Sequence, residues 1–386
     1  MFNPSELERM PKKIESIFTD LELKIMQDII RRIRINEEIT RSADWQIYRL
    51  VQMGKHTEEI KKYIQATLQL TDKEINTLFE DAAQSGYVRD KKLYEATGKE
   101  FIPFQENQEL QQTVQAIISQ TKSAMENITQ TTGFMVEIGG KMTITPTSVY
   151  FQQTLDRVVM GVASGTFDYN SFLKEIIHEM TKSGLRTVDY ASGWHNRIEV
   201  ATRRAVMTGI TQLTSKINDI NAAALGTDYF EVSWHATARP EHQVWQGKVF
   251  SRQELIDICG LGTGPGLCGW NCYHSYWPFI PGVSKRQWTD EQLEKMNATE
   301  NTPKKYKGKE YTKYEATQRQ RQLESLMRIQ RQRIQLLKEG GANAEDITAA
   351  QAKYRATMAQ YVNFSKAMNL PQQRERIYMD GLGRVG

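Results

Sequence analysis

Residues 205–225 read AVMTGITQLTSKINDINAAAL and carry the longest regular apolar pattern of the chain. Apolar residues recur at alternating spacings of four and three positions, namely Val206, Ile210, Leu213, Ile217, Ile220 and Ala224. This is the spacing of an a/d seam on one face of an α-helix. The pattern therefore predicts a long helix whose seam packs against another helix, either of the same chain or of a neighbouring subunit.

More helices are predicted on the N-terminal side of this seam. Apolar residues recur every three or four positions from Ile14 to Ile33, and a thinner apolar stripe runs through residues 107–132. Such stripes are typical of amphipathic helices. Residues 57–79 are interpreted as two short helices joined near Thr71, because Thr71-Asp72-Lys73-Glu74 has the form of a capping box. We expect plain packing of this pair rather than DNA reading by a helix-turn-helix.

Other patterns indicate β-structure and a helical C-terminus. Alternating apolar residues on both sides of Gly139-Gly140 predict a β-hairpin. After residue 227 the helical period stops, and Gly, Pro, Trp and Cys cluster as in a compact β and loop module. The basic stretch Lys304–Lys309 is predicted to be a linker. Two helices follow, Lys313–Lys338 and Ala344–Met368, for which an antiparallel helical hairpin is the simplest architecture.

The expected fold class is therefore α+β and predominantly α-helical. Long helices carry a small β/loop His-Cys module and a C-terminal helical hairpin. Four consecutive segments are expected: an N-terminal helical region (1–132), a central hairpin with helices (133–226), a β/loop module rich in His, Cys and Trp (227–300), and a basic linker with a helical hairpin (301–386).

Composition and charge narrow the class of protein. No apolar run approaches the roughly 20 residues that cross a bilayer, and the first residues lack the basic and apolar regions of a signal peptide. We therefore expect a protein made in a cytoplasm, with no membrane contact. Three cysteines give no disulfide framework, which favours a reducing compartment. Residues 301–386 carry 17 Lys/Arg and 8 Asp/Glu, so this part can bind polyanions or simply present a solvated basic face.

Histidine and cysteine gather between residues 235 and 274, where three of the six histidines and all three cysteines lie. The predicted metal ligands are His242, Cys268, Cys272 and His274. Thiol and imidazole groups suit tetrahedral zinc, and a structural zinc would stabilise a module with few regular elements. The spacing differs from the Cys-x2-Cys pair of ordinary zinc modules. The other explanation is that the thiols pack as small apolar groups and the imidazoles bond to loop groups.

Other motifs in this module suggest chemistry that their context does not support. The glycine-rich run 260–266 contains Pro265 and is followed by no helix start, so a loop is expected rather than a phosphate cradle. Arg239 is expected to donate a fork of hydrogen bonds to loop carbonyls or to a carboxylate. The aromatic residues are expected to form the core of the module. No catalytic residue is predicted.

Three blocks of this sequence run from Ser192 to Gly209, from Gly226 to Phe250 and from Gly266 to Ser275. Together these blocks resemble the phage minor capsid protein 2 family. The segment 317–324 is similar as well, and the likeness covers nearly the whole chain with the blocks in the family's order. The His and Cys positions are also similar to those of Mu F-like head morphogenesis proteins.

The resemblance implies a minor structural protein of a tailed-phage head at or near the portal vertex. It implies a role in head morphogenesis, and in DNA packaging or delivery, through protein and DNA contacts and without enzyme activity. The implied partners are the portal protein, capsid proteins and packaged double-stranded DNA, and the implied location is the virion head, assembled in the bacterial host cytoplasm. The predicted DNA or portal contacts are Arg319, Arg321, Arg328, Arg331 and Arg333.

Two other functions stay open. One is a virion-carried metal-dependent hydrolase or toxin-like effector centred on His235, His242 and Cys272. An open coordination position on a bound metal would favour this function. The other is a DNA-binding scaffold that acts during assembly and is absent from mature particles.

Overall fold

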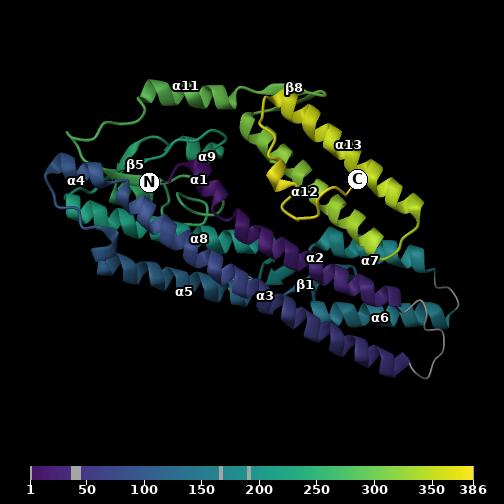
Figure 1. Ribbon diagram of the computed structural model, residues 1–386. Helices are drawn as coiled ribbons and strands as arrows, with labels where there is room; N and C mark the ends of the chain where they lie inside the picture. The colour runs from purple at the N-terminus through teal and green to yellow at the C-terminus, as the bar shows by residue number, and fades with distance from the viewer. Residues whose placement is uncertain (1, 36–44, 165–167, 189–192, 386) are drawn as a thin grey trace. The chain divides into compact units, whose positions relative to one another are not determined.

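The computed structural model describes residues 2–35, 45–164, 168–188 and 193–385, which form long α-helices and small antiparallel sheets (Figure 1). The predicted class, a predominantly helical α+β protein, is confirmed. The chain makes two compact units, each assembled from three stretches of sequence. Unit 1 contains Met1–Lys13, Asp72–Ala124 and Arg203–Gln318, and unit 2 contains Ile14–Thr71, Met125–Thr202 and Arg319–Gly386. The division into four consecutive segments stays a prediction.

Helices form most of unit 1. The long ones are the C-terminal part of α3 (Trp45–Val88), most of α5 (Gln108–Gln130) and most of α8 (Ile198–Leu225). The short ones are α1 (Pro4–Arg9), α4 (Lys91–Thr97), the 3-10 turn η2 (Phe104–Glu106), α9 (Pro240–Gln243), α10 (Arg252–Asp257) and α11 (Asp290–Asn301). The starts of α1, α10 and α11 are capping boxes, in which two side chains satisfy two free amides.

The apolar seam of α8 packs against helices of the same chain. Its first four members, Val206, Ile210, Leu213 and Ile217, are completely buried, as predicted. Between them, a Cβ added to Gly209 would come within 2.6 Å of both Phe79 of α3 and Thr121 of α5. The glycine therefore lets the backbone of α8 approach both neighbours closely.

The last two members of the seam leave the buried face. Ile220 is half-buried and Ala224 is exposed, and Ala222 and Leu225 are buried in their place. A straight helix has 3.6 residues per turn, so it drifts by about 20° per heptad against a 3.5-residue repeat. The predicted a/d pattern was therefore correct for the first half of the helix and wrong for its end.

A three-stranded antiparallel sheet forms the predicted β and loop module of unit 1. Its order is β6-β5-β7, with β5 at Tyr229–Val232, β6 at Val249–Ser251 and β7 at Tyr276–Phe279. In register, Phe230 faces Phe250 on one side and Pro278 on the other. The core below this sheet includes Trp245 and Tyr276, which confirms an aromatic core, whereas Trp270 is 62% exposed and lies outside it.

The basic stretch after Pro303 forms a β-hairpin, so its prediction as a linker was wrong. Strand β8 (Lys304–Tyr306) pairs with β9 (Lys309–Tyr311). The two turn residues, Lys307 and Gly308, have φ of 48° and 83°. Positive φ at both central residues is the requirement of a type I′ turn, whose twist matches that of the two strands.

Unit 2 combines helices with a four-stranded sheet of order β2-β1-β3-β4. Its first helices are α2 (Lys12–Ile35), the N-terminal part of α3, α6 (Thr147–Ala163) and α7 (Tyr169–Ser183). The strands are β1 (Gly133–Ile138), β2 (Lys141–Pro146), β3 (Arg186–Val188) and β4 (His195–Arg197). The predicted hairpin is β1-β2, and Gly139 and Gly140 make its turn with φ of 58° and 77°.

The C-terminal helices form the predicted antiparallel hairpin in unit 2. Helices α12 (Lys313–Glu339) and α13 (Ala344–Met368) lie side by side (Figure 1). Three hydrogen bonds fix the direction, because residue numbers rise on one helix as they fall on the other: Gln320 to Ser365 at 2.9 Å, Tyr361 to Glu324 at 3.1 Å and Gln330 to Thr357 at 3.0 Å.

The segment after α13, residues 370–385, folds back along α12. It contains the 3-10 turn η3 (Arg374–Arg376). The carbonyl of Pro371 accepts a hydrogen bond from Gln320 near one end of α12, and the carbonyl of Val385 accepts one from Lys338 near the other end. This segment therefore covers the helical hairpin along most of α12.

Helix α3 runs without a break from Trp45 to Val88. The predicted junction of two short helices near Thr71 was wrong. Thr71 is completely buried, and Ile75 and Phe79 are buried one and two turns further on. Burial of this face outweighs a local capping signal, which contributes only about 0.5–2 kcal/mol. Among the described residues, we find no helix with the length and apolar character that a membrane span requires.

Candidate metal centre and the groove beside it

Helix α9 and the loop before β7, both in unit 1, bring the histidine and cysteine side chains together. His242 lies on α9, which begins with Pro240 at its first position. Cys272 and His274 lie in the loop that leads into β7. This loop follows two left-handed residues, Cys268 with φ of 60° and Asn271 with φ of 53°, which turn the chain back under α9. Residues 30 positions apart in sequence thereby become neighbours.

The ligand atoms of His242, Cys272 and His274 all lie within 4.8 Å of one another. The sulfur of Cys272 is 3.8 Å from Nδ1 of His242 and 3.4 Å from Nδ1 of His274. All three side chains are buried. Three of the four ligands predicted from the sequence therefore meet at one point.

The far nitrogens of both imidazoles are hydrogen-bonded to oxygen. Nε2 of His242 lies 2.8 Å from the carbonyl oxygen of Pro265, and Nε2 of His274 lies 3.0 Å from Oε1 of Gln246. The carbonyl can only accept, so His242 must donate from Nε2. Oε1 of Gln246 also accepts from the backbone N–H of His235, so His274 donates from Nε2 as well. In the neutral imidazoles, both Nδ1 lone pairs therefore point toward the sulfur.

Burial governs the protonation of these groups. It lowers the pKa of His242, and it lowers that of His274 well below the usual value, with the neighbouring His235 adding to the second shift. Burial raises the pKa of the Cys272 thiol. At neutral pH and without a cation, both imidazoles are therefore neutral and the thiol is protonated.

The remaining members of the predicted cluster lie at its edge. The thiol of Cys268 donates to the carbonyl oxygen of His274 at 3.5 Å, and its sulfur is outside the group of three ligand atoms. The ring of His235 lies 4.1 Å from that of His274, with its Nδ1 2.8 Å from the carbonyl of Ala236. Cys259 belongs to the apolar core of the module, where burial raises its pKa to about 12.

Arg239 and the glycine-rich loop hold the cluster from outside. The guanidinium of Arg239 donates one hydrogen bond, to the carbonyl of Trp270 at 3.0 Å, and lies 4.0 Å from the carboxylate of Glu241, so one hydrogen bond of the predicted fork is present. No helix opens after residues 260–266, which form turns, so the loop prediction is confirmed. Glycine is needed at 264, because a Cβ there would come within 2.7 Å of the Trp270 ring.

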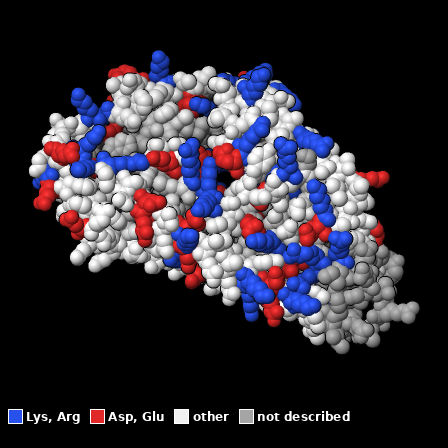
Figure 2. Space-filling model, viewed as in Figure 1, with Lys and Arg blue, Asp and Glu red and all other residues white. Residues whose placement is uncertain are grey.

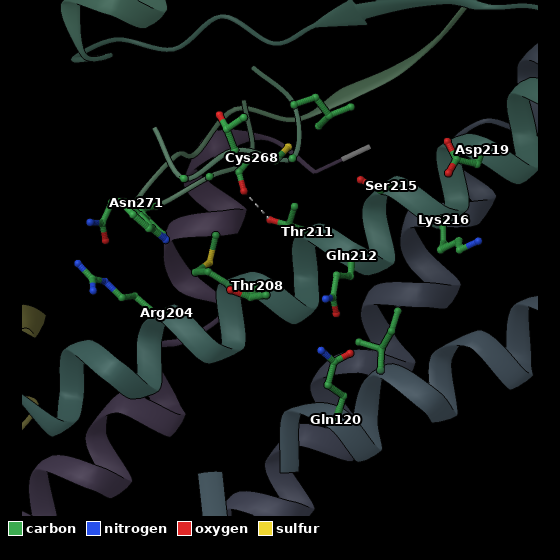
Figure 3. Close-up of a pocket in the computed structure, with 18 of the residues that line it drawn as sticks. Gln120, Arg204, Thr208, Thr211, Gln212, Ser215, Lys216, Asp219, Cys268 and Asn271 are labelled. Carbon is green, nitrogen blue, oxygen red and sulfur yellow. Dashed lines mark hydrogen bonds between the residues drawn. The ribbon is translucent and has the colours of Figure 1, made fainter. Parts of the chain in front are cut away.

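A groove of about 850 Å³ lies between α5, α8 and this loop (Figure 3). Thr208, Thr211 and Ser215 line it from α8, and Thr211 donates to the carbonyl of Cys268 at 3.3 Å. Among the described residues that line the groove there is no histidine, and the single carboxylate, Asp219, is paired with Arg252 at 2.6 Å. The groove therefore supports binding better than acid–base chemistry.

The arginines predicted to contact DNA or a portal differ in their surroundings, and Arg331 is a correction. Its side chain is 1% exposed and donates to both carboxylate oxygens of Asp380 at 2.8 Å, so it cannot reach a partner. The other four, Arg319, Arg321, Arg328 and Arg333, are half-buried. On the face drawn in Figure 2, basic and acidic side chains are interspersed.

Sequence reasoning missed the groups that orient the cluster and the partner of Arg331. Gln246 and Pro265 contribute an amide oxygen and a backbone carbonyl, and neither residue type stands out in a search for ligands. Gln246 carried a weak signal, because it follows His242 by four positions within a loop-rich segment. Asp380 lies 49 positions from Arg331, and no local pattern connects them.

The sequence of this chain is similar to those of known phage proteins. The family model described as phage minor capsid protein 2 matches residues 2–364. A protein of Lactococcus phage LL-H, described as a structural protein, is 24% identical over 268 residues, which are 65% of this chain and 70% of that protein. No solved structure matches the chain. Ser192, which begins the first family-like block, lies outside the described residues.

Proposed function

This chain belongs to the phage minor capsid protein 2 family, and from that premise we propose that it works at or near the portal vertex of a tailed-phage head. As a member of that family it is a minor structural protein of the phage particle. Its proposed role is head morphogenesis and DNA packaging or delivery, with assembly in the cytoplasm of the bacterial host. The proposed partners are the portal protein, capsid proteins and packaged double-stranded DNA.

One observation carries this proposal: the family match extends over residues 2–364, and so through both compact units. A match limited to the His-Cys module would be compatible with a capsid-derived domain in a protein of other function. A match that includes the long helices instead supports a structural role in the phage particle for the whole architecture.

The proposed mode of action is binding without catalytic turnover. The hydrolase alternative is centred on His235, His242 and Cys272, and a catalytic group must contact its substrate. His242 and Cys272 are 2% and 4% exposed, and His235 is half-buried. The groove beside them contains hydroxyl and amide groups along α8, which suit polar contacts with another protein. These features favour a binding protein over the alternative of a virion-carried hydrolase or effector.

A cross-linking experiment tests the proposed location. Purified particles treated with a lysine-reactive cross-linker are expected to yield peptides that join this chain to the portal protein. Lys55, Lys61 and Lys92 are exposed and can serve as reactive sites. Cross-links to the major capsid protein alone, in particles whose portal does cross-link to its known neighbours, would contradict a place at the portal vertex.

A second experiment tests the proposed DNA contact. The change Arg319→Gln, Arg321→Gln and Arg333→Gln removes three positive charges from α12, and we expect fewer particles that retain DNA. Each phosphate contact adds to a salt-dependent affinity, so the difference between the variant and the unaltered chain is expected to be largest at low ionic strength and to shrink as ionic strength rises. The matched control is Lys55→Gln, Lys61→Gln and Lys92→Gln, which makes the same change in net charge on exposed residues elsewhere. Equal DNA retention by both triple variants would refute a contact specific to α12.

A further inference from the structure

We propose that Nδ1 of His242, Sγ of Cys272 and Nδ1 of His274 bind one zinc ion that holds the loop before β7 against α9. The site lies within unit 1, and its argument is independent of the role in the particle. It concerns how the β/loop module keeps its fold.

The two sulfur–nitrogen distances fit a tetrahedral ion. With Zn–S near 2.3 Å and Zn–N near 2.05 Å, two ligands at the tetrahedral angle are separated by roughly 3.6 Å from sulfur to nitrogen. The two sulfur–nitrogen distances here are 3.8 and 3.4 Å, one on each side of that value. These distances allow a zinc ion between the sulfur and each nitrogen, and rotation of the imidazoles would bring both nitrogens, which lie within 4.8 Å of each other, onto the same ion.

The hydrogen bonds around the cluster are those of metal-binding histidines. A metal-bound imidazole usually donates its other N–H to a carbonyl or carboxylate, which fixes the ring and its tautomer. His242 does this to Pro265, and His274 does it to the amide oxygen of Gln246. The amide of Gln246 is itself held, because its Nε2 donates to Asn297 at 2.9 Å. The ligand orientation is thus fixed by residues that are not ligands.

The number of hydrogen-bond donors in the cluster also favours a bound cation, because one S–H faces two imidazole nitrogens. The Cys272 thiol carries one proton, whereas two buried imidazole lone pairs face its sulfur. One S–H can serve only one of them, and a buried acceptor without a donor costs free energy. Zinc binding would release the thiol proton to water, and the ion would then accept one electron pair from the thiolate and one from each imidazole, with the thiolate balancing part of its charge.

Burial assigns the ion a structural role. His242, Cys272 and His274 are 2%, 4% and 2% exposed, which leaves a substrate no access to the metal. Three protein ligands leave one tetrahedral position, which the Cys268 thiol does not fill here, because it donates to the carbonyl oxygen of His274 and lies outside the ligand group. The ion would tie α9 to a loop whose other support consists of turns, and so stabilise the wall of the groove that carries Cys268 and Trp270.

Cys259 provides a matched control within the same module. Like Cys272 it is a buried thiol, but it lies in the apolar core and outside the ligand group. The full-length chain, purified without added chelator, is expected to contain one zinc per chain by elemental mass spectrometry. The variant Cys272→Ser removes the soft ligand with little change in volume and is expected to lose most of the zinc, whereas Cys259→Ser is expected to keep it.

A second measurement avoids the danger that Cys272→Ser fails to fold. Replacement of the zinc of the unaltered chain by cobalt is expected to give the thiolate-to-cobalt absorption in the near ultraviolet. It is also expected to give the visible bands of a tetrahedral site. The proposal is overturned if the unaltered chain contains no stoichiometric metal and a chelator does not change its melting temperature. It is equally overturned if the cobalt form lacks the thiolate band, or if Cys259→Ser loses as much metal as Cys272→Ser.

Discussion

The variant Asp380→Ala is expected to destabilise unit 2 strongly. Asp380 and Arg331 are 0% and 1% exposed at their side chains and are joined by two hydrogen bonds of 2.8 Å. The guanidinium also donates to the carbonyl of Gly383 at 2.9 Å, and the carboxylate accepts from the amide of Leu382. Removal of the carboxylate leaves a buried positive charge without compensation, which costs about 3–5 kcal/mol.

Urea unfolding followed by circular dichroism measures the global loss, and hydrogen exchange of residues 370–385 measures the release of the C-terminal segment from α12. The control is Lys24→Ala, which breaks an exposed pair with Asp20 in the same unit and is expected to cost under about 1 kcal/mol. The double variant Arg331→Met with Asp380→Leu is expected to recover most of the stability, because no charge then remains buried. An Asp380→Ala protein within about 1 kcal/mol of the unaltered chain, with the segment still protected, would refute this reasoning.

Further predictions concern glycine positions and pH. Gly209→Ala is expected to destabilise unit 1 by about 1–3 kcal/mol, because the added Cβ would overpack against Phe79. Gly54 has open space around it, so Gly54→Ala is expected to stabilise α3 by about 0.5–1 kcal/mol. Melting temperatures that rank the two variants in the opposite order would contradict this packing. Burial, followed by the nearby Glu199, raises the pKa of Glu22 above 4.5, so the folded chain binds this proton more tightly than the unfolded chain does. The free energy of unfolding is therefore expected to fall as pH rises above 4.5 toward the raised pKa of the folded chain. Glu22→Gln should flatten that slope, and an unchanged slope would contradict the assignment to Glu22.

The sequence was sufficient where one local pattern decides the structure. Helices α12 and α13 were predicted as two consecutive helices with an antiparallel arrangement, and β1-β2 follows the alternation of apolar residues around Gly139-Gly140. Each of these elements pairs with its neighbour in sequence, so few arrangements compete. The predicted fold class was correct for the same reason.

The sequence was insufficient where distant residues decide. A capping box at Thr71 predicted a helix start, but burial of Thr71 and Phe79 on one continuous face keeps α3 helical. Arg331 looked like a surface cation, because its partner Asp380 lies in a segment that returns from beyond α13. Helical periodicity predicts which side of a helix is buried, but not which charged group packs against a residue on that side.

The candidate metal centre could be predicted in part. Residue types alone suggested four ligands, and the structure brings three of them together with the tautomers that a metal requires. The positions of Gln246 and Pro265 decide those tautomers, and only the three-dimensional arrangement supplies them.

Absolute quantification of this chain by mass spectrometry of purified, DNA-filled particles tests the central claim most directly. If the chain is a minor structural protein at the portal vertex, it is expected in every preparation, at a copy number close to that of the portal subunit and far below that of the major capsid protein. Its absence from mature particles, or an abundance that follows the major capsid protein, would contradict the account.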